Sequence, residues 1–434
     1  MFDTVASQVS ALSFVDIFNF CVFLTFTICY TYQLFYVLVV LTRRAPKKVA
    51  RANHRYAVMV AARNEETVIA DLIHSIKVQN YPAELIDIFV IADNCTDNTA
   101  DVAREAGAIV FPRSNDKLVG KGYALDYGLK AIWEQYADRD YEAFFVFDAD
   151  NLLDENYIAE MNRTFCDGYE IVTSCRNSKN YGDNWISAGY ALWFLRDSQF
   201  LNRPRMLLGT SSVVAGTGFL FSRAVLDRCV GWKFFLLSED TEFTARNILD
   251  GEKIAYCENA VFYDEQPTDF GQSCRQRMRW ARGYLQVFGK YGTKLIRGVF
   301  RGSFACFDMI MSTMPAIILM IAALIVNIAG FFACLVKDES VMSVVYTALW
   351  GTFQGYLTFF CVGIVTTIAE WRNIHCSTKK KILYLFTFPL FMLTYVPVSI
   401  AAVFKKAEWR PIRHTVAITV KEIRKKGATT ENKV

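Results

Sequence analysis

Two aspartates one residue apart, Asp148 and Asp150, are the residues of this 434-residue chain whose types and spacing most clearly suggest chemistry. They follow a run of apolar and aromatic residues at 144–147 that predicts a buried strand. Two carboxylates at a strand end repel each other unless a cation lies between them. Oxygen ligands of this kind suit Mg²⁺ or Mn²⁺ carrying a phosphate. The alternative interpretation is an acidic turn that only closes the strand.

Strands and helices alternate around this motif. The pattern predicts further strands at 56–62, 85–93 and 108–112, and helices at 68–80, 99–107 and 122–137. Alternation at this spacing predicts right-handed βαβ units in a mostly parallel sheet. Ligands of such sheets lie beyond the carboxyl ends of the strands, so the polar residues that follow each strand should meet in one crevice. The chain has no GxGxxG motif, which argues against a dinucleotide ligand.

Apolar residues, which make up 53% of the chain, are concentrated in four blocks. These blocks span residues 12–41, 306–336, 341–369 and 382–404, and each exceeds the roughly 20 residues that a membrane-spanning helix requires. Six basic residues follow the first block between positions 43 and 55. By the positive-inside rule this places the N-terminus outside and the middle domain in the cytoplasm. In the last block, Pro389 and Pro397 predict a bent or re-entrant segment that would keep the basic tail inside.

Charge and cysteine content argue against a nucleic-acid-binding protein and against a zinc-binding or disulfide-rich protein. The net charge of +4 is small and the basic residues lie beside the apolar blocks, so the pattern does not indicate a nucleic-acid partner. Twelve cysteines occur without CxxC pairs, which indicates reduced thiols and predicts no zinc site.

Six motifs occur in the order found in membrane-embedded family 2 glycosyltransferases, which include cellulose, hyaluronan and poly-N-acetylglucosamine synthases. They are AARNEE, ADNCTDNTA, GKGYALDYGL, FDADN, SEDTEF and QRMRW, and they cover about residues 56 to 284. The chain therefore resembles that family. The resemblance implies a GT-A domain, a Rossmann-like α/β fold with a mostly parallel sheet, inserted on the cytoplasmic side between transmembrane helices. The implied segments are a first span with its basic flank (1–55), the GT-A domain (56–270), interface helices (271–304), a membrane region (305–404) and a basic tail (405–434).

On the donor side, the resemblance places Arg63, Glu65 and Asp93 around the base and ribose of a nucleotide sugar. The residues support this independently, because carboxylates at adjacent strand ends can accept hydrogen bonds from a ring N–H or ribose hydroxyls. The alternative for this polar stretch is a helix N-cap cluster. The family often has a second acidic residue where this chain has Asn94, so this chain departs from the family pattern there.

Donor phosphates and metal are expected around the next two motifs. Lys121 lies between two glycines just before a helix, where it is either a diphosphate ligand or a solvated loop lysine. The resemblance assigns Asp148 to the nucleotide sugar and its metal and Asp150 to direct coordination of Mg²⁺ or Mn²⁺. The ion would neutralise the diphosphate as the nucleotide leaves.

Catalytic residues are expected at the start of a later helix. Early acidic residues such as Glu239 and Asp240 also suit the helix dipole. The resemblance makes Asp240, with Glu239 beside it, the catalytic pair, and Asp240 the general base that deprotonates the acceptor hydroxyl and inverts the anomeric centre. Gly216 and Thr217 would form the floor of the acceptor pocket, although a structural glycine turn is an equal alternative.

The QRMRW segment predicts an acceptor surface. On a helix, Gln276, Arg279 and Trp280 share one face, with Arg suited to phosphate and Trp to a sugar ring. The arrangement resembles the QxxRW signature of processive synthases. The segment also predicts a basic amphipathic helix at the membrane surface, formed with Arg275, Arg277, Arg282 and Lys290. Trp409 is a candidate match for the gating-loop motif of hyaluronan synthases, with a different spacing.

The predicted protein is an integral membrane, inverting glycosyltransferase that uses a UDP-sugar and a divalent metal to extend a β-linked exopolysaccharide processively. An alternative is non-processive transfer of one sugar to a polyprenyl-phosphate or lipid acceptor. A non-catalytic scaffold is a further alternative, which the intact clustered carboxylates disfavour. With only four membrane segments, a homodimer is one way to complete a polymer channel. Membrane lipids are expected partners, and nucleic acid is not.

Overall fold

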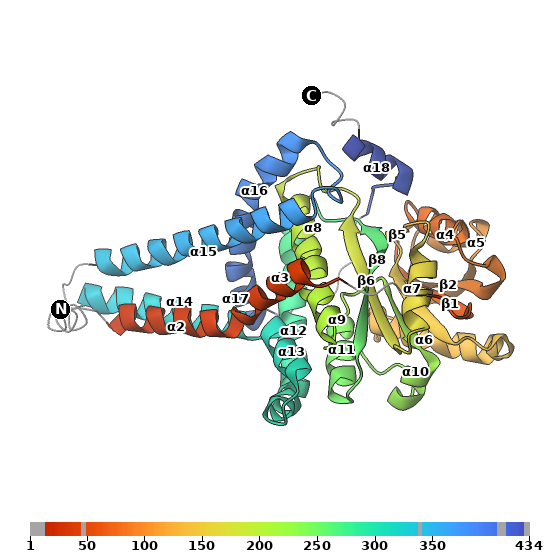
Figure 1. The fold of residues 1–434 in the computed structure, drawn as a ribbon, viewed down its shortest axis with the longest axis horizontal. Coiled ribbons are helices and arrows are strands. Elements are labelled where there is room, and N and C mark those ends of the chain that lie inside the picture. The colour runs from red at the N-terminus through yellow and green to blue at the C-terminus, as the bar shows by residue number, and fades with distance from the viewer. Residues whose placement is uncertain (1–13, 45–48, 337–340, 406–413, 429–434) are drawn as a thin grey trace.

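A mixed eight-stranded sheet forms the centre of the α/β domain in the computed structural model, which describes residues 14–44, 49–336, 341–405 and 414–428. The strands lie in the order β3-β2-β1-β4-β7-β6-β8-β5 (Figure 1). They are β1 (Tyr56–Ala62), β2 (Ile86–Asp93), β3 (Ile109–Arg113), β4 (Ala143–Asp148), β5 (Leu152–Leu153), β6 (Ile171–Ser178), β7 (Phe219–Ser222) and β8 (Ile254–Asp264). The domain therefore has the predicted α/β class.

The two halves of the sheet have different topologies. Strands β3, β2, β1 and β4 pair in parallel, with Tyr56 opposite Ile86 on one side and Ala143 on the other. Beyond β4, strand β7 runs antiparallel to both β4 and β6, while β6 and β8 are parallel. The parallel half coincides with the alternating part of the sequence pattern, and the mixed half follows it.

Both faces of the sheet are covered, which explains why its central strands are apolar throughout. Because successive side chains point to opposite faces, Val58 and Phe145 pack on one side with α4 (Ile69–Lys77) and α7 (Tyr157–Phe165). Met59 and Phe144 pack on the other side with α6 (Lys121–Gln135), α10 (Arg223–Cys229) and α11 (Glu239–Leu249). The remaining helices of the domain are α5 (Thr99–Glu105), α8 (Trp185–Asp197), α9 (Arg203–Leu208) and α12 (Phe270–Phe300).

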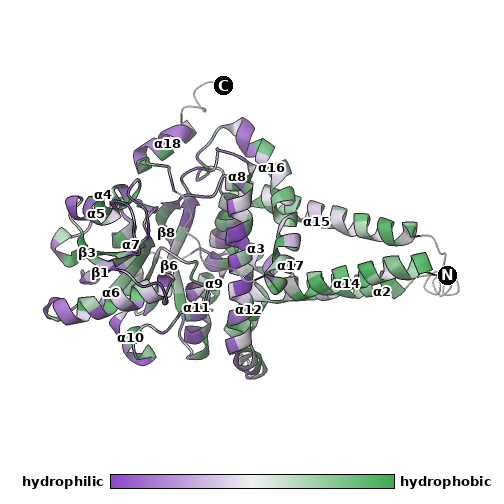
Figure 2. Ribbon diagram, turned by 180° about the vertical axis from the view of Figure 1, so that it is seen from behind, coloured by the Kyte–Doolittle hydropathy of each residue, from purple (hydrophilic) through white to green (hydrophobic). Residues whose placement is uncertain are grey.

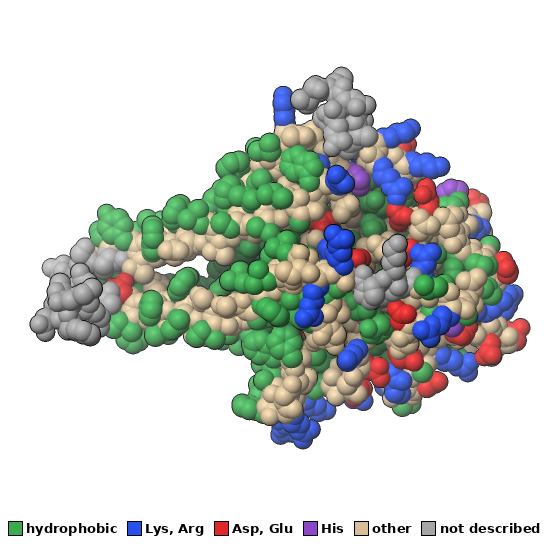
Figure 3. All heavy atoms as spheres, viewed as in Figure 1, with side chains coloured by type: hydrophobic (Ala, Val, Ile, Leu, Met, Phe, Trp, Pro, Cys, Tyr) green, Lys and Arg blue, Asp and Glu red, His purple; other side chains and the backbone are tan. Residues whose placement is uncertain are grey.

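Four helices in the described part of the chain are long and apolar enough to cross a membrane. They are Phe14–Thr42, which comprises α2 (Phe14–Tyr30) and α3 (Tyr32–Thr42); Ile318–Val336 within α14 (Pro315–Val336); Val344–Ala369 within α15 (Met342–Ala369); and Thr378–Phe404. Helices α2, α14 and α15 extend away from the α/β domain (Figures 1 and 2). Apolar side chains cover their outer surface (Figure 3). The four predicted blocks are confirmed as helices of spanning length.

The last block is interrupted once, close to Pro397, whereas Pro389 lies inside a helix that continues past it. Helix α16 (Thr378–Leu393) ends and α17 (Tyr395–Phe404) begins around Thr394. Arg277 of α12, which is fully buried, donates to the hydroxyl of Thr394 at 2.6 Å and to the carbonyl of Phe391 at 3.3 Å. A side chain from the α/β region thereby satisfies polar groups at the break. On which side of a membrane the tail lies stays a prediction.

A buried polar network ties the first span to the α/β domain. Asp308 of α13 (Phe304–Thr313) accepts from Arg205 of α9 at 2.6 and 2.9 Å, and from the hydroxyls of Tyr32 and Tyr36 at 2.7 and 2.9 Å. The side chains of both ions are 3% exposed. Every oxygen of the carboxylate is satisfied, so the buried charge is compensated and the geometry of the junction is fixed.

Candidate active site

The loop before β7 and the start of α6 meet at the end of β4. Lys121 is the first residue of α6, and its ammonium donates to the carboxylate of Asp148 and, at 2.8 Å, to the carbonyl of Gly216. The backbone N–H of Asp148 donates to the hydroxyl of Thr217 at 2.9 Å. The structure thus brings together four residues that the sequence predicted separately. Asp148 keeps 38% of its side chain exposed, so its carboxylate remains accessible.

Two predicted nucleotide-side residues follow neighbouring parallel strands. Asp93 at the end of β2 is buried and forms an ion pair with Arg113 at the end of β3. Asn94 has a φ of 54°, a left-handed conformation that Asn tolerates, and its side chain accepts from the backbone of Asn115 at 2.7 Å. Arg63 lies half-buried just beyond β1. Sequence reasoning missed Arg113, although it also lies at a strand end.

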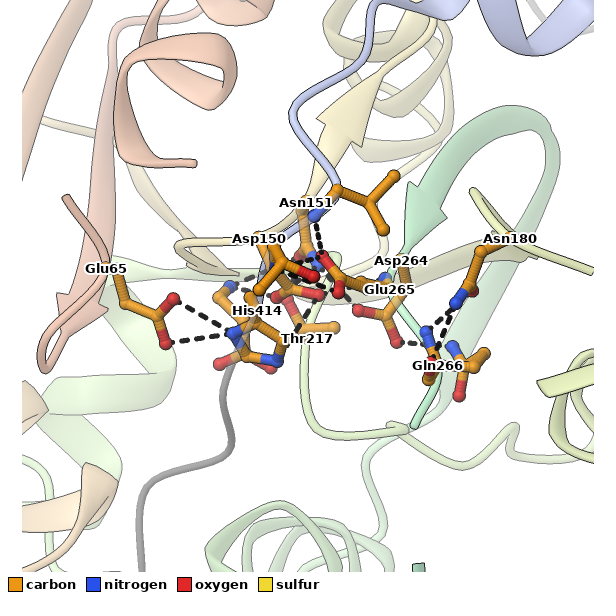
Figure 4. A network of polar contacts seen from close by, with 12 residues as sticks. Glu65, Asp150, Asn151, Asn180, Thr217, Asp264, Glu265, Gln266 and His414 are labelled. Atoms are coloured by element: carbon orange, nitrogen blue, oxygen red, sulfur yellow. Dashed lines mark hydrogen bonds and ion pairs between the residues drawn. The ribbon is translucent and has the colours of Figure 1, made fainter. Parts of the chain in front are cut away.

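Asp150 lies in a polar network that β8 completes (Figure 4). The side chain of Asp150 is 3% exposed, and one of its oxygens accepts from the backbone N–H of Glu265 at 2.9 Å. Asn151 donates to Asp264 at 3.1 Å. Burial, and then repulsion from Asp150, raises the pKa of Asp264 to about 7, against the lowering effect of Arg176. These β8 residues were not predicted, although the same strand-end signal that singled out Asp148 applies to Asp264 and Glu265.

The C-terminal segment reaches this network from the far end of the chain. His414 Nδ1 lies 2.9 Å from a carboxylate oxygen of Glu65, and its Nε2 lies 3.9 Å from Asp150 Oδ2. Burial disfavours a charged imidazole, but Asp150 and Glu65 outweigh that effect and raise the pKa of His414 to about 10. The position between the two carboxylates therefore favours positive charge. Sequence reasoning missed His414, since no local pattern marks it.

Helix α18 (Val420–Ala428) anchors that segment on the α/β domain. Its apolar residues Val420 and Ile423 pack against Leu152 and Tyr263. Arg424 forms ion pairs with Asp154 and Glu155, and the backbone N–H groups of Thr415 and Val416 both donate to Glu265 at 3.0 Å. These contacts hold the chain that follows His414 on the α/β domain.

The predicted catalytic pair lies beside the glycine turn. Glu239 and Asp240 begin α11. A Cβ on Gly216, which has a φ of 81°, would lie 3.7 Å from an Asp240 carboxylate oxygen. Burial, and then the charge of Asp240, raises the pKa of Glu239 to about 7, while Lys121 opposes the shift. Burial likewise raises the pKa of Asp240, against Lys121 and Arg279. Asp240 is therefore a stronger base than an ordinary aspartate.

Helix α12 places the QxxRW residues next to α11 and α8. The ring of Trp280 packs edge-on against Tyr190 at 5.7 Å and Phe194 at 6.1 Å between centroids. The side-chain oxygen of Gln276 is buried and has no hydrogen-bond partner among the described residues, and the same holds for the hydroxyl of Ser238. Buried polar groups are nearly always satisfied, so these two atoms call for an explanation.

The basic residues of α12 differ from the prediction of a helix lying at the membrane surface. Arg275 is exposed, but Arg277 is fully buried against α16 and α17. Arg282 donates to two carbonyls near the end of α17, at 3.3 and 3.4 Å, and Lys290 pairs with Glu242. The helix is packed between the α/β domain and the last membrane segment, so these cations bind protein groups.

The structure does not test the prediction for Trp409, and it shows only part of the predicted metal site. Trp409 lies outside the described residues. Within them, no group of three or more His, Cys, Asp or Glu side chains is arranged to hold a metal ion. Any ion at Asp150 would therefore take further ligands from its substrate or from water, as is usual for Mg²⁺.

Comparison with known sequences places this geometry in context. Residues 54–283, more than half of the chain, match the family model described as glycosyltransferase like family 2. A probable glycosyltransferase of Bacillus subtilis is 25% identical over 55% of this chain and 57% of its own. The β-monoglucosyldiacylglycerol synthase of Nostoc is 28% identical over 62% and 57%. A poly-β-1,6-N-acetyl-D-glucosamine synthase of Staphylococcus epidermidis is 24% identical over 53% and 54%. The chain spans about half the length of these relatives.

Among solved structures, a mannosyltransferase of Pyrobaculum calidifontis, in complex with GDP-Man and Mn²⁺, is similar to this chain. The TM-score is 0.57 at 14% identity, and the similarity covers 89% of this chain and 98% of the other. At this identity the likeness shows the fold, which is the GT-A type flanked by helices.

Proposed function

The chain belongs to glycosyltransferase like family 2, and from this premise we propose that it is an inverting glycosyltransferase. It would transfer a hexose from a nucleotide-sugar donor to an acceptor hydroxyl. The observation that supports this most is the position of Lys121, which joins Asp148 to the Gly216 turn beside Asp240. A cation for the diphosphate and a base for the acceptor thus lie on either side of one turn.

The proposed reaction uses these residues in one displacement. Asp240 accepts the proton of the acceptor hydroxyl, whose oxygen forms a bond to the anomeric carbon of the donor. The bond between that carbon and the phosphate oxygen breaks, and the electron pair leaves with the nucleoside diphosphate. Lys121, at the N-terminus of α6, would stabilise the departing charge together with the backbone N–H groups there. Attack from the face opposite the leaving group converts an α-linked donor into a β-linked product.

A divalent metal, Mg²⁺ or Mn²⁺, fits the residues around Asp150. Asp150 supplies a buried carboxylate oxygen, and the position beside Asp150 and Glu65 that favours a charged His414 would equally favour a metal ion in place of that charge. Asp148, whose carboxylate is accessible, would contact the same ion or the donor phosphates. When bound, the metal would neutralise the diphosphate. Glu65, Arg63 and Asp93 remain the proposed contacts of base and ribose.

We propose a UDP-sugar as donor and a growing β-linked exopolysaccharide as acceptor, extended processively at the cytoplasmic face. The QxxRW residues beside Asp240 and the similarity to poly-N-acetylglucosamine synthases support this proposal. The second candidate is transfer of one sugar to a lipid. It is supported by the similarity to β-monoglucosyldiacylglycerol synthases and by the small number of candidate spans, four among the described residues. We also propose a homodimer as one way to complete a polymer channel.

The test uses the purified protein in nanodiscs with Mn²⁺ and a panel of UDP-glucose, UDP-N-acetylglucosamine and GDP-mannose. Nucleotide release and product size are followed together. One UDP-sugar giving a high-molecular-weight, β-glycosidase-sensitive product is expected. Turnover that requires added diacylglycerol or polyprenyl phosphate, and stops after one transfer, would favour the second candidate. Turnover that persists in EDTA would contradict the metal assignment.

A further inference from the structure

Arg176 of β6 connects the two sides of the site. Its Nε donates to an oxygen of Asp264 at 2.7 Å, and a second nitrogen of the guanidinium donates to the same oxygen. Its remaining terminal nitrogen donates to the carbonyl of Ala215 at 3.1 Å. The face of the guanidinium lies 3.8 Å from the ring centre of Phe194. One side chain thus contacts a carboxylate, a loop and an aromatic ring.

Each of these contacts leads to a different part of the proposed site. Asp264 accepts from Asn151, whose own oxygen accepts from the backbone of Asp148 at 3.2 Å. Ala215 immediately precedes Gly216, whose carbonyl accepts from Lys121.

The third contact leads to the acceptor side. Phe194 packs against Trp280 with 6.1 Å between ring centres and an interplanar angle of 67°. The order of contacts is therefore Trp280, Phe194, Arg176, Asp264, Asn151 and Asp148. Arg176 is the member of this series that touches both the aromatic and the acidic part.

We propose that Arg176 is a positioning residue that sets the acceptor ring at Trp280 in register with the donor at Asp148. This inference rests on the proposed glycosyl transfer. Arginine suits the role because its planar, delocalised cation can donate sideways and stack face-on at the same time, and its side chain is only 14% exposed. A lysine keeps the charge but cannot make both contacts. Misplacement of the two substrates by about 1 Å can cost on the order of 100-fold in rate.

The predicted effect is a change in how the donor sugar is divided between transfer to the acceptor and hydrolysis. A misplaced acceptor lets water attack the donor instead. In Arg176→Lys, the ratio of labelled sugar transferred to labelled free sugar should fall about tenfold. Affinity for UDP in the presence of Mn²⁺, measured by titration calorimetry, should stay within about twofold of wild type, because Arg176 contacts no proposed nucleotide ligand. Phe194→Leu removes the ring face alone and should shift the ratio in the same direction by less.

Arg205→Lys is the matched control. Arg205 is likewise buried and bonded twice to an aspartate, Asp308, but at the junction with the first span. This variant should lose stability with no change in the partition ratio. All variants are assayed in nanodiscs with the radiolabelled donor that wild type uses and with the acceptor fraction that it labels.

The outcomes separate the inference from its premise. An unchanged ratio in both Arg176→Lys and Phe194→Leu would overturn the positioning role, as would an equal fall in Arg205→Lys. If Arg176→Lys does not fold, Phe194→Leu alone decides. If wild type consumes no donor, the proposed transfer itself fails and the inference fails with it.

Discussion

On the proposed donor side of the site, the carboxylates accept hydrogen bonds from the protein itself, whereas the proposed acceptor side has buried polar atoms without partners among the described residues. Asp93 is bound by Arg113, Asp148 by Lys121 and Glu65 by His414. By contrast, the hydroxyl of Ser238 and the side-chain oxygen of Gln276 have no partner within the described residues.

This difference suggests that donor binding and acceptor binding depend on separate sets of residues. The donor side is preorganised, because its charges are already held in place before a nucleotide arrives. On the proposed acceptor side, the two unpaired buried atoms show that the polar groups are not yet matched by protein partners among the described residues. Donor binding and transfer should therefore respond separately to substitution.

The largest expected effect is that of Asp240→Asn. Removing the general base should lower the transfer rate by about 10²- to 10⁴-fold. Donor affinity, measured by calorimetry with UDP and Mn²⁺, should be nearly unchanged because the donor side is held by other residues. If donor affinity fell in parallel with transfer, the two sides would not be independent.

Gly283→Ala should cause the second-largest loss of transfer. A Cβ at this position of α12 would lie 2.1 Å from the Ser238 hydroxyl oxygen, so α11 and α12 must move apart. We expect about a 100-fold loss of transfer with donor affinity retained.

Gly289→Ala on the same helix is the control for that change, because a Cβ there meets no atom within 4 Å among the described residues. It should leave transfer unchanged and stabilise the helix by up to about 1 kcal/mol. If both variants lost transfer equally, the loss would come from alanine anywhere in α12. The close contact between Gly283 and Ser238 would then not explain it.

His414→Ala should change the donor side alone. The charged imidazole beside Asp150 and Glu65 competes with a metal ion for these carboxylates, so we expect Mn²⁺ affinity in the presence of UDP to rise on the order of tenfold, measured by the electron paramagnetic resonance signal of free Mn²⁺. His54→Ala is the control, because that histidine pairs with Glu142 away from the site. Unchanged Mn²⁺ affinity in His414→Ala would restrict the histidine to holding the C-terminal segment.

The smallest effect concerns pH. Asp240 must be ionised to act, and its pKa is raised by burial, so transfer should decline as pH falls through the raised pKa values of the pair. The pKa of Glu239 is about 7, raised by burial and by Asp240, and repulsion between two carboxylates is mutual. Glu239→Gln should therefore move the acid limb of the transfer rate to lower pH. A limb that stays in place would show that Asp240 titrates independently.

Much of the fold was predictable from local pattern. The alternation from Tyr56 to Asp148 predicted four parallel strands, and the structure has them in neighbouring positions. The mixed half was harder, because its strands pair through antiparallel and irregular contacts, including a register shift between Ser174 and Cys175. Of the two prolines predicted to break the last span, only Pro397 lies near the interruption, and the sequence did not identify Arg277 as the residue that donates to Thr394 there.

The sequence by itself determined which side chains stand at strand ends and helix starts, because hydrophobic periodicity and chain direction act over a few residues. That was sufficient to group Glu65, Asp93 and Asp148 at one edge of the sheet, whereas Asp240 was assigned through the family resemblance. Only the tertiary structure brought His414 to Glu65, across 349 positions of sequence, and aligned Arg176 between Asp264 and Phe194. Such contacts depend on how distant elements pack, and no local preference of the residues involved encodes that packing.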